Sequence, residues 1–561
     1  MENSNTGTVI IAGGGITGIR SALELANSGF KVYLVEKAPA IGGTFSQLSS
    51  AYPDDKPAFC RFAPDINAVY RHPNIKIITN AEISRVKGEA GNFEVKVVKN
   101  PLRVNENCTA CGDCMRVCPI KPYDTFNEGL ILRTAIDIHN STAYPFLYNI
   151  EKETPICVET CPVHINIRKY IGLIAEGKFL EALKVIRERN PLPAICGRVC
   201  NHPCEDACNR GKIDQPVAID ALKRFVADYE LKLRKEGKSF LPKPPEKSKH
   251  IKVAVVGAGP AGLTVAHDLA LKGYDCTIYE AAPVPGGMLW LGIPEYRLPR
   301  DIIEVEVDYI KHLGVDIKLN TPINKDFTID DLFKKGYKAV FLGIGAHKGL
   351  KLRVPGEDDY EGFLDCVVFL RRVNLGDKSK PGKKVIVIGG GNSAIDSART
   401  ALRLGSDEVY ILYRRSRKEM PANPWEVEEA EREGVKIHYL AAPVKILGSN
   451  GKVTGMLCTK MRLGKLDASG RRRPIPVEGS EFEVEADCII PAISQRPDIS
   501  FLHEGHGLEI SRWDSFVIDK NGATNRPGIF AGGDDVTGPA TVIEAIAAGH
   551  TAADSMDRYL S

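Results

Sequence analysis

Short apolar runs alternate with helix-like segments along most of the chain, which is the pattern of strands and helices in parallel α/β folds. The first segment, from Thr8 to about Lys99, opens with the run TVIIA, a glycine turn, the helix-like RSALELANSG and the strand-like VYLVEK. Comparable units follow one another from Ile251 to Ser561. This order of strand, helix and strand predicts parallel sheets joined by crossover helices.

Other stretches follow different patterns. INAVYRHPNIKIITNAEISRVKG and GNFEVKVVKN alternate apolar and polar residues, as the strands of a small meander do. Residues 166–189 place apolar side chains at helical spacing, which predicts a helical domain. Residues 231–250 combine basic charge with proline and few apolar residues, so we expect a linker there.

Length and composition narrow the class of protein. A chain of 561 residues should fold as three or four units. Its formal net charge of +3 and its 26% of charged residues are ordinary for a soluble globular protein and do not favour nucleic acid as a partner. We find no apolar stretch long enough for a membrane span, and residues 1–7 show no apolar signal core, so we expect a cytoplasmic protein without membrane insertion.

Three glycine turns have the spacing of dinucleotide sites. Such a site needs a tight turn after a strand, a bare backbone where the pyrophosphate approaches, and a helix N-terminus that supplies N–H groups. One such motif is weak evidence, whereas three in strand–turn–helix context are strong. The residues are Gly13, Gly15 and Gly18; Gly257, Gly259 and Gly262; and Gly389, Gly391 and Ala394.

The end of the second strand in each unit indicates which nucleotide binds. Glu36 and Glu280 stand where a carboxylate accepts hydrogen bonds from an adenosine ribose. Both units also carry a later glycine doublet, as flavin enzymes often do. In the third unit the strand ends in Arg414 and Arg415, which suit a 2′-phosphate, so we favour NADP(H) over NAD(H). The alternative is that these arginines belong to a solvated turn.

A second flavin element follows Thr524 in the sequence GIFAGGDD and GPATVIEAIAAG. The strand would deliver Asp534 towards a ribityl hydroxyl, and the helix that starts near Thr541 would direct its positive end at the flavin. Together with the turn at Gly257 this completes one FAD site. AVFLGIGAHKG and IIPAISQRPD are then the two crossings between the FAD domain and an inserted pyridine-nucleotide domain. The neighbours that complete the predicted cofactor sites are Gly43, Pro260, Ala261, Ala281, Gly286, Gly287, Met288, Gly292, Ile293, Gly345, Gly390, Asn392, Ser393, Gly533 and Val542.

Ten of the fifteen cysteines lie between residues 108 and 208, which favours metal ligation over disulfides in a reduced compartment. The first four, followed by Pro119, have the C-x2-C-x2-C-x3-C-P spacing of bacterial ferredoxins. The other six predict at least one further [4Fe–4S] cluster and leave open a second, and the spacing does not partition them. The predicted ligands are Cys108, Cys111, Cys114, Cys118, Cys157, Cys161, Cys196, Cys200, Cys204 and Cys208.

Residues 157–561 resemble a flavin-subunit family that includes the small subunit of glutamate synthase, the N-terminal half of dihydropyrimidine dehydrogenase and the large subunit of NADH-dependent ferredoxin:NADP oxidoreductase. The motifs are CPVHI, ICGRVCNHPCEDAC, VAVVGAGPAGL, GGMLWLGIPEYRLPR, VIVIGGGNSAIDSARTALRLG, YRRSRKEMPA and GIFAGGDDVTGPATVIEAIAAG. The resemblance implies that NAD(P)H passes hydride to FAD and that clusters link the flavin to a partner. Lys223 stands where some members of the family present a glutamine or glutamate ligand.

Residues 8–150 resemble instead the start of the flavoprotein subunit of heterodisulfide reductase, through GGGITGIRSALELANSGFKVYLVEKAPAIGG, RHPNIKIITNAEISRVKGEAGNFEVKV, CTACGDCMRVCP and FNEGLILRTAI. That family's first domain ends with an Asp-bearing turn, and we find only one such element, at Asp534. The N-terminal unit is therefore predicted to be half of a flavin site, with a second FAD possible and a vestigial structural domain as the alternative.

These patterns predict an α/β flavoprotein with two dinucleotide-binding domains, an FAD domain and an inserted NAD(P) Rossmann-like domain, preceded by iron–sulfur segments. The predicted parts are an N-terminal Rossmann-like domain, a ferredoxin-type segment, a helical iron–sulfur domain, the first part of the FAD domain, the NAD(P)H domain and the second part of the FAD domain, at residues 1–100, 101–150, 151–240, 241–375, 376–490 and 491–561.

We predict an NAD(P)H oxidoreductase subunit that exchanges electrons with other redox subunits or ferredoxin through one FAD and two or three [4Fe–4S] clusters. No catalytic acid or base is expected, because hydride transfer between stacked rings needs none. His347, Asp396 and Glu426 are therefore expected to be structural. Two alternatives stay open, a self-contained electron bifurcator with two FADs and a redox-inert scaffold subunit that carries clusters.

Overall fold

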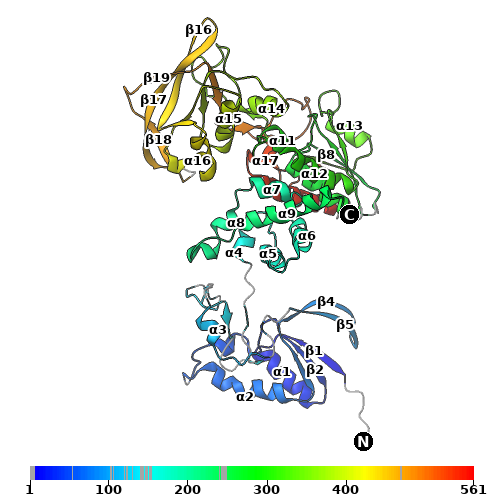
Figure 1. Ribbon diagram of the computed structural model, residues 1–561. Coiled ribbons are helices and arrows are strands. Elements are labelled where there is room, and N and C mark those ends of the chain that lie inside the picture. Colours follow the sequence, from blue (N-terminus) through cyan, green and yellow to red (C-terminus); the bar gives the residue numbers. More distant parts are fainter. Residues whose placement is uncertain are drawn as a thin grey trace. The chain divides into compact units, whose positions relative to one another are not determined.

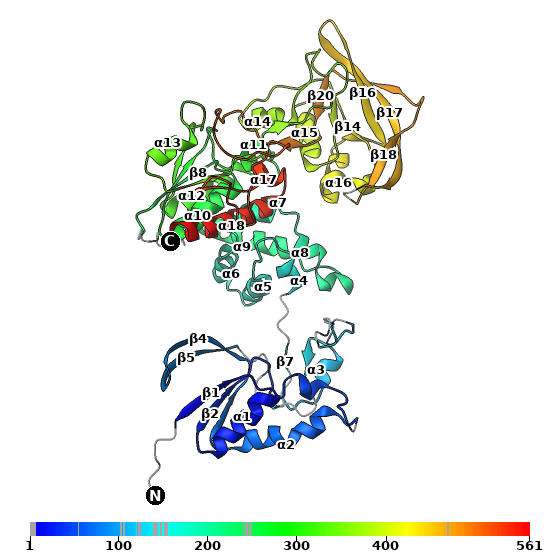
Figure 2. The same cartoon turned by 180° about the vertical axis from the view of Figure 1, so that it is seen from behind.

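The chain folds into two compact units, Met1–Glu153 and Thr154–Ser561, in the computed structural model (Figures 1 and 2). The structure describes residues 7–53, 55–100, 104, 107–118, 121, 124, 126–128, 130–138, 144–145, 149–150, 155–238, 241, 245, 249–467 and 470–561. No helix within these ranges is long and apolar enough to cross a membrane.

The first unit is built on a sheet of three parallel strands in the order β1-β2-β3. The strands are β1 (Thr8–Ala12), β2 (Lys31–Val35) and β3 (Ile75–Ile78). Helix α1 (Ile16–Asn27) buries Ile19 and Ala22. The glycine turn thus stands between a strand and a helix, as the spacing predicts.

Helix α2 (Ala58–Arg71) corrects one prediction, because it contains the segment INAVYR that we expected in a strand. The buried side chains Phe62, Ile66 and Val69 recur every three or four residues along α2 and pack in one cluster with Ile19 of α1. This helical spacing is stronger than the short alternation that suggested a strand. The expected meander is reduced to the antiparallel hairpin of β4 (Ala81–Glu89) and β5 (Asn92–Lys99).

The predicted ferredoxin-type segment contains little regular structure among its described residues. They include the helical turn α3 (Asp113–Arg116) and the paired strands β6 (Ile136–Asp137) and β7 (Asn149–Ile150), and a short 3-10 turn, η1 (Thr44–Gln47), lies earlier in the unit. Pro119, which follows the fourth cysteine of the run, lies outside the described residues.

The second unit begins with a helical domain. Its elements are α4 (Ile156–Glu159), α5 (Ile167–Ala175), α6 (Phe179–Arg187), α7 (Pro193–Val199), α8 (Pro203–Asp206), the 3-10 turn η2 (Asn209–Lys212) and α9 (Ile219–Lys235). The helical spacing of residues 166–189 is confirmed as two helices that are separated at Gly177, whose φ is +74°. Helix α9 also includes Leu231–Lys235, which we expected to be linker.

A five-stranded parallel sheet in the order β10-β9-β8-β11-β22 forms the next layer. Its strands are β8 (Lys252–Val256), β9 (Asp275–Tyr279), β10 (Asp316–Lys318), β11 (Ala339–Leu342) and β22 (Ile529–Ala531). The helices of this part are α10 (Pro260–Leu271), α11 (Met288–Leu291), α12 (Arg300–His312), α13 (Ile329–Lys334), α17 (Asp534–Thr537) and α18 (Val542–Leu560). Strand β22 follows β11 in the sheet but lies almost 190 residues later in the sequence, so a further domain is inserted in the chain between these two strands.

The inserted domain has a second parallel sheet in the order β15-β14-β13-β20. Its strands are β13 (Lys384–Ile388), β14 (Glu408–Tyr413), β15 (Lys436–Tyr439) and β20 (Cys488–Pro491), and its helices are α14 (Cys366–Asn374), α15 (Asn392–Arg403), the 3-10 turn η3 (Arg417–Glu419) and α16 (Pro424–Arg432). The antiparallel strands β16 (Ala441–Ser449), β17 (Lys452–Leu466), β18 (Arg472–Pro476) and β19 (Phe482–Glu485) form a separate sheet.

The two crossings between the domains lie side by side. Strand β12 (Lys348–Gly349) pairs antiparallel with β21 (Gln495–Arg496). These strands fall within the two stretches that we predicted as crossings, so the interleaved arrangement is confirmed.

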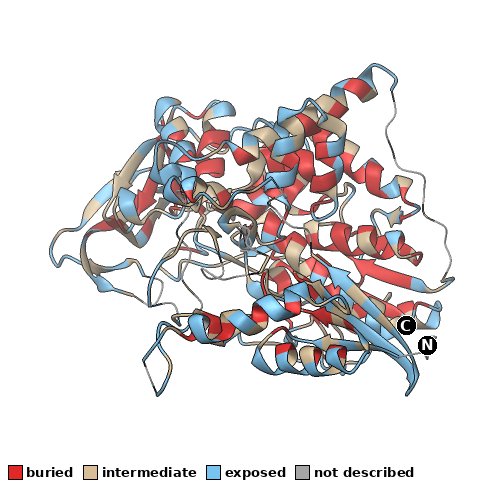
Figure 3. Ribbon diagram, turned by 90° about the horizontal axis from the view of Figure 1, so that it is seen from below, coloured by how far each residue is buried: buried red, intermediate tan, exposed pale blue. Residues whose placement is uncertain are grey.

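One hydrophobic core extends through the helical domain and the five-stranded sheet that contains β8. It joins Ile186 and Ile195 of α6 and α7 with Val255 of β8, Ile303 of α12 and Ile546 of α18. In Figure 3 the buried residues line the inner faces of helices and strands, and the exposed residues face outwards. The helical domain is therefore part of one body with the sheet that follows it.

Candidate functional site

The glycine turn after β8 has the shape that a dinucleotide requires. Gly257 has a φ of +101°, a conformation that favours glycine. A β-carbon on Gly262 would lie 2.1 Å from the carbonyl oxygen of Gly257, whereas a β-carbon on Gly259 would meet nothing within 4 Å. Helix α10 therefore begins on an open backbone, where an anionic pyrophosphate can approach its N-terminus.

Glu280 braces this turn from the end of β9. Its two carboxylate oxygens accept hydrogen bonds from the backbone N–H groups of Ala258 at 2.7 Å and Ala282 at 2.8 Å. Burial raises the pKa of Glu280, while these backbone donors oppose the rise. Each carboxylate oxygen can accept a further hydrogen bond, so the residue can hold the turn and also receive a ribose hydroxyl.

The C-terminal element brings a second carboxylate and a helix N-terminus to the same place. Asp534 follows β22, and burial raises its pKa to about 6. Its Oδ1 accepts a hydrogen bond from the N–H of Ala540 at 3.2 Å. Thr541 caps α18 through a reciprocal pair of hydrogen bonds with Glu544. The buried Asp535 was not predicted, and it accepts a hydrogen bond from the N–H of Ile344, which fixes the loop after β11.

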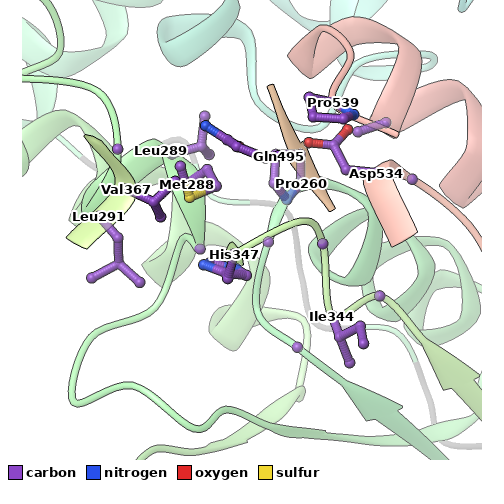
Figure 4. A pocket seen from close by; sticks show the side chains of 18 of the residues that line it. Pro260, Met288, Leu289, Leu291, Ile344, His347, Val367, Gln495, Asp534 and Pro539 are labelled. Atoms are coloured by element: carbon purple, nitrogen blue, oxygen red, sulfur yellow. The ribbon is translucent and has the colours of Figure 1, made fainter. Parts of the chain in front are cut away.

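These residues line one cavity of about 720 Å³. Figure 4 shows Pro260, Met288, His347 and Asp534 among the side chains of its wall. The predicted cofactor residues that line it are Gly257, Gly259, Pro260, Ala261, Glu280, Ala281, Gly287, Met288, Gly292, Ile293, Gly345, Asn392, Ser393, Gly533, Asp534, Thr541 and Val542.

Other predicted cofactor residues lie outside this lining. They are Gly262, Gly286, Gly389, Gly390, Gly391, Ala394, Arg414 and Arg415 in the second unit, and Gly13, Gly15, Gly18, Glu36 and Gly43 in the first. Of these, Gly262, Gly286 and Gly389 allow close approach of neighbouring segments, because a β-carbon at each would lie within 3.1 Å of another atom.

The helical domain also reaches the cavity, which we did not predict. Val199 and Asn201, on either side of Cys200, line it. The Oδ1 atom of Asn201 is buried and has no hydrogen-bond partner among the described residues. The cysteine spacing was visible in the sequence, but no pattern in ICGRVCNHPC distinguishes residues that face a neighbouring domain.

The turn after β13 repeats the same backbone design in the inserted domain. A β-carbon on Gly389 would lie 2.2 Å from the carbonyl oxygen of Ala492, and one on Gly390 would lie 2.4 Å from the ring of Tyr413. A β-carbon on Gly391 would meet nothing within 4 Å, and α15 starts directly after it. Asn392 and Ser393 at the start of α15 line the same cavity as Gly257 and Gly259, so the two glycine turns adjoin one space.

The two arginines at the end of β14 lie in different environments. Arg414 is exposed. Arg415 is 5% exposed, and its guanidinium donates to the carbonyl oxygen of Arg472 at 2.8 Å and to Asp467 at 2.6 Å. The structure therefore corrects the expectation that both arginines are available to a 2′-phosphate, because Arg415 is engaged inside the domain.

The residues that we considered as acids are held in structural contacts or stay neutral. Asp396 pairs with Arg297 at 2.7 Å, and Glu426 pairs with Arg297 at 3.0 Å and with Arg399 at 2.7 Å. Burial, reinforced by the charge of Arg371, lowers the pKa of His347 to about 4, so its ring is uncharged at neutral pH.

The glycine turn of the first unit repeats the contacts of the turn after β8. Glu36 accepts hydrogen bonds from the N–H groups of Gly14 at 2.5 Å and Ala38 at 2.7 Å, in the places where Glu280 binds its two donors. A β-carbon on Gly43 would lie 3.1 Å from the Cα of Gly15. The corresponding distance in the second unit, from Gly287 to Gly259, is 3.0 Å.

The two units have similar glycine turns, but their sheets differ. Among the described residues of the first unit, no strand pairs with β1 on the side opposite to β2. In the second unit β11 and β22 occupy that side of β8, and the chain after β22 carries Asp534. The described part of the first unit thus contains only the glycine-turn part of this arrangement, and FAD binding there stays a prediction.

Six predicted cluster ligands lie within the helical domain. Cys157 is in α4, Cys196 in α7 and Cys204 in α8, and Cys161, Cys200 and Cys208 lie at or beside helix ends. Thiol sulfur is the donor that iron–sulfur clusters take, so the donor set fits such a group. No three Cys, His, Asp or Glu side chains among the described residues gather closely enough for one metal ion, so their partition stays a prediction.

Lys223 on α9 is a buried cation beside these thiols. It is 6% exposed and pairs with Asp220 at 2.6 Å. Burial opposes its charge, but Asp220 and the thiols of Cys200 and Cys196 raise its pKa. A buried ammonium group at this point favours negative charge on neighbouring sulfur.

The ferredoxin-type run lies in the first unit. Cys111 is exposed, Cys108 and Cys114 are half-buried, and Cys118 is buried. The Sγ of Cys111 lies 3.6 Å from Asp113 Oδ2. All fifteen cysteines lie within the described residues, and none of them forms a disulfide there.

Three family models match the chain. The model for pyridine nucleotide-disulphide oxidoreductases matches residues 251–549. The model for dihydropyrimidine dehydrogenase domain II, 4Fe-4S cluster, matches residues 150–235, and the model for FAD dependent oxidoreductases matches residues 8–95. Together they cover the glycine-turn regions and the helical cysteine domain described above.

Three curated relatives are similar over most of the chain. NADP(+)-dependent formate dehydrogenase subunit beta of Moorella thermoacetica is 48% identical, and the match covers 72% of this chain and 60% of that protein. NADPH-Fe(3+) oxidoreductase subunit beta of Geobacter sulfurreducens is 42% identical over 86% of this chain and 75% of that protein. Glutamate synthase [NADPH] small chain of Escherichia coli is 34% identical over 72% of this chain and 89% of that protein.

Proposed function

Because this chain belongs to the pyridine nucleotide-disulphide oxidoreductase family, as an NADPH-dependent oxidoreductase subunit with FAD and [4Fe–4S] domains, we propose that it relays electrons between NADPH and a partner redox protein. The relatives named above are components of formate dehydrogenase, glutamate synthase and an NADPH-Fe(3+) oxidoreductase. The partner in our proposal is another redox subunit or a ferredoxin-type carrier that receives or supplies single electrons.

The chain's own residues would hold the reactants in one cavity. FAD would lie with its pyrophosphate on the turn at Gly259, its ribose near Glu280 and its ribityl chain near Asp534. The nicotinamide nucleotide would lie on the turn at Gly391. Bound FAD accepts a hydride and releases electrons singly, and iron–sulfur clusters carry one electron at a time.

The observation that carries the proposal is the position of Cys200. Val199 and Asn201, its two neighbours in the sequence, line the same cavity as Gly259 and Asp534. A cluster bound through Cys200 would therefore lie at the wall of the flavin site. A redox-inert scaffold would have no need of a cysteine segment in the flavin cavity, so the geometry favours the relay over the scaffold.

Anaerobic reduction tests this function. NADPH added to protein with full FAD and iron should bleach the flavin absorbance and then produce an electron paramagnetic resonance signal from a reduced cluster. A Cys200→Ser variant should still bleach its flavin but lose the signal of the cluster in the helical domain. Flavin and clusters that stay oxidised in the presence of either NADPH or NADH would refute the oxidoreductase proposal.

A second candidate function, electron bifurcation with two FADs, is favoured by the first unit alone. Its glycine turn and Glu36 repeat the contacts that Glu280 makes in the second unit. Two flavins would allow the two electrons of one hydride to leave by separate routes. In this proposal another polypeptide supplies the flavin-facing strand that the described part of the first unit does not contain.

The flavin content of the intact complex decides between one flavin and two. Two FAD per polypeptide, falling to one in a Gly15→Val variant, would support bifurcation. One FAD per polypeptide in the unaltered protein would restrict the first unit to a cluster-carrying role.

A further inference from the structure

The loop between β17 and β18 is fastened to the end of β14, where an NADP-binding fold recognises the 2′ position of the adenosine ribose. The buried guanidinium of Arg415 makes two attachments, one to Asp467 Oδ2 in the loop at 2.6 Å and one to the carbonyl oxygen of Arg472, the first residue of β18, at 2.8 Å. A buried arginine that donates to two partners in this way is rigid and is satisfied by them. Its hydrogen bonds are thus directed at the loop.

Backbone hydrogen bonds join the described residues of this loop. The N–H of Asp467 donates to the carbonyl oxygen of Arg471 at 2.8 Å, and the N–H of Gly470 donates to the carbonyl oxygen of Asp467 at 3.0 Å. Because Asp467 also receives Arg415, the backbone of Arg471 is held at a fixed place beside the end of β14. Arg471 is half-buried there.

Arg414 also lies at the end of β14, but its environment differs from that of Arg415. It is exposed and makes no hydrogen bond or ion pair among the residues that the structure describes. Burial of part of its side chain and the positive charges of Arg415 and Arg471 lower its pKa. Arg414 precedes Arg415, and Arg415 bonds to Asp467 and to the carbonyl oxygen of Arg472, the neighbour of Arg471. Arg414 and Arg471 therefore lie on two bonded segments at the same end of β14, where both positive charges can attract an anion.

We propose that the 2′-phosphate of NADPH is bound by Arg414 together with Arg471, a residue of the β17–β18 loop outside the glycine-turn motif, and that Arg415 is a positioning residue for this loop. The inference rests on the nucleotide-binding part of the proposed function. A 2′-phosphate carries up to two negative charges and three acceptor oxygens, so two converging guanidinium groups match it better than one.

The first test removes the charge of Arg471. In the FAD-loaded full chain, Arg471→Ala should weaken NADP⁺ binding at least tenfold in titration calorimetry and change NAD⁺ binding less than twofold. Arg473→Ala is the matched control, because Arg473 is an exposed arginine on β18, in the same segment. Equal effects of Arg471→Ala and Arg473→Ala on NADP⁺ would overturn the proposal.

The second test separates positioning by Arg415 from direct binding by Arg415. Asp467→Ala leaves both arginines of β14 in place but releases the guanidinium of Arg415 and loosens the loop. If the loop supplies a phosphate ligand, this variant should lose NADP⁺ affinity at least fivefold. If Arg415 itself binds the phosphate, its release should leave NADP⁺ affinity unchanged or increase it, which would refute the assignment.

The two proposals fail in different ways. Unaltered protein that binds neither NADP⁺ nor NAD⁺ and whose flavin is not reduced by either reduced nucleotide would refute the proposed function and this inference with it. Normal flavin reduction by NADPH combined with insensitivity of NADP⁺ binding to Arg471→Ala would refute the inference alone. Unchanged flavin content and NAD⁺ affinity show that each variant is folded.

Discussion

Two glutamates, Glu36 and Glu280, are equivalent in their contacts but differ in what surrounds them. Each accepts one backbone N–H from the glycine turn and one from the residue two positions further along the chain. Glu280 lies in a cavity with walls from several elements, whereas the sheet that carries Glu36 has three described strands. The pair therefore offers a direct comparison of the two glycine-turn units.

Replacing each glutamate by alanine should reveal how many flavins the chain holds. Glu280→Ala removes two charge-assisted hydrogen bonds, each worth about 1.5–3 kcal/mol, so the second unit should release most of its FAD. Glu36→Ala should lower the flavin content only if the first unit binds FAD. Flavin absorbance per polypeptide after gel filtration measures both, and the exposed Glu295→Ala is the control. Full retention of FAD by Glu280→Ala would show that the assignment of Glu280 is wrong.

Buried charges connect the FAD domain to the inserted domain through Arg297. Its guanidinium, with a side chain 10% exposed, pairs with Asp396 on α15 and Glu426 on α16. Arg297→Leu would leave two buried carboxylates without this cation and should cost about 3–5 kcal/mol of stability. Denaturant unfolding measures the loss, and the double variant Arg297→Leu with Asp396→Leu should recover part of it. No change in the unfolding midpoint would contradict the role assigned to this contact.

At the scale of elements, the contact between α7 and α12 predicts a dependence on pH. The carboxylate of Glu306, on α12, accepts the N–H of Ala194, at the start of α7, at 2.7 Å. Burial raises the pKa of Glu306 from 4.5 to about 7, against the opposing charge of Arg187. A raised carboxyl pKa means that Glu306 favours the folded state fully below about pH 4.5, and that this contribution is lost as the pH rises through about 7.

Glu306→Gln should remove that dependence, because glutamine keeps the acceptor for Ala194 without the charge. Above pH 7 the variant should be more stable than the unaltered protein by about 3 kcal/mol, and below pH 5 the two should be similar. Thermal unfolding of the FAD-loaded protein at pH 5 and pH 8 measures the difference. A variant less stable at both pH values would show that Glu306 acts as a charged partner of Arg187.

The helices, strands and turns were predictable from the sequence where their conformation depends on neighbouring residues alone. The turns at Gly13, Gly257 and Gly389 have φ values above +100°, which glycine adopts without strain, so their spacing predicted their conformation. The segment INAVYR was wrongly predicted as a strand, because six residues cannot show that Ile66 and Val69 pack on another helix. Contacts between distant segments, such as Arg415 with Asp467, leave no periodic signal in the sequence.

At the scale of the whole molecule, the two cysteine groups lie in different units. Cys111 belongs to the first unit and Cys204 to the second. Serine at either position should therefore remove a different cluster, with a loss of about four iron atoms per polypeptide. Reduction of FAD by NADPH should persist in both variants. Iron analysis and electron paramagnetic resonance check this result, and loss of the same spectroscopic species from both variants would show that the groups share one site.

Some residues of the candidate site were predictable from the sequence, and others were recognised only in the folded structure. The residues that would touch a nucleotide through their own backbone, such as Gly259 and Gly391, were evident from spacing. Val199 and Asn201 were not, because their place in the cavity depends on how the helical domain packs against the sheet. Sequence motifs thus predicted the cofactors, whereas the residues that the helical domain contributes to the cavity became evident only in the fold.

The common core of the helical domain and the FAD domain also sets an order of events during protein synthesis. The Nε2 of His550, on α18, donates a hydrogen bond to the carbonyl oxygen of Arg189, a residue 361 positions earlier in the chain. At about 5–20 residues per second, roughly 20–70 s separate the emergence of these two partners from the ribosome. Throughout that interval α7, which carries Cys196, has no α18 to pack against, so the core that the helical domain shares with α18 is completed only after α18 has been synthesised.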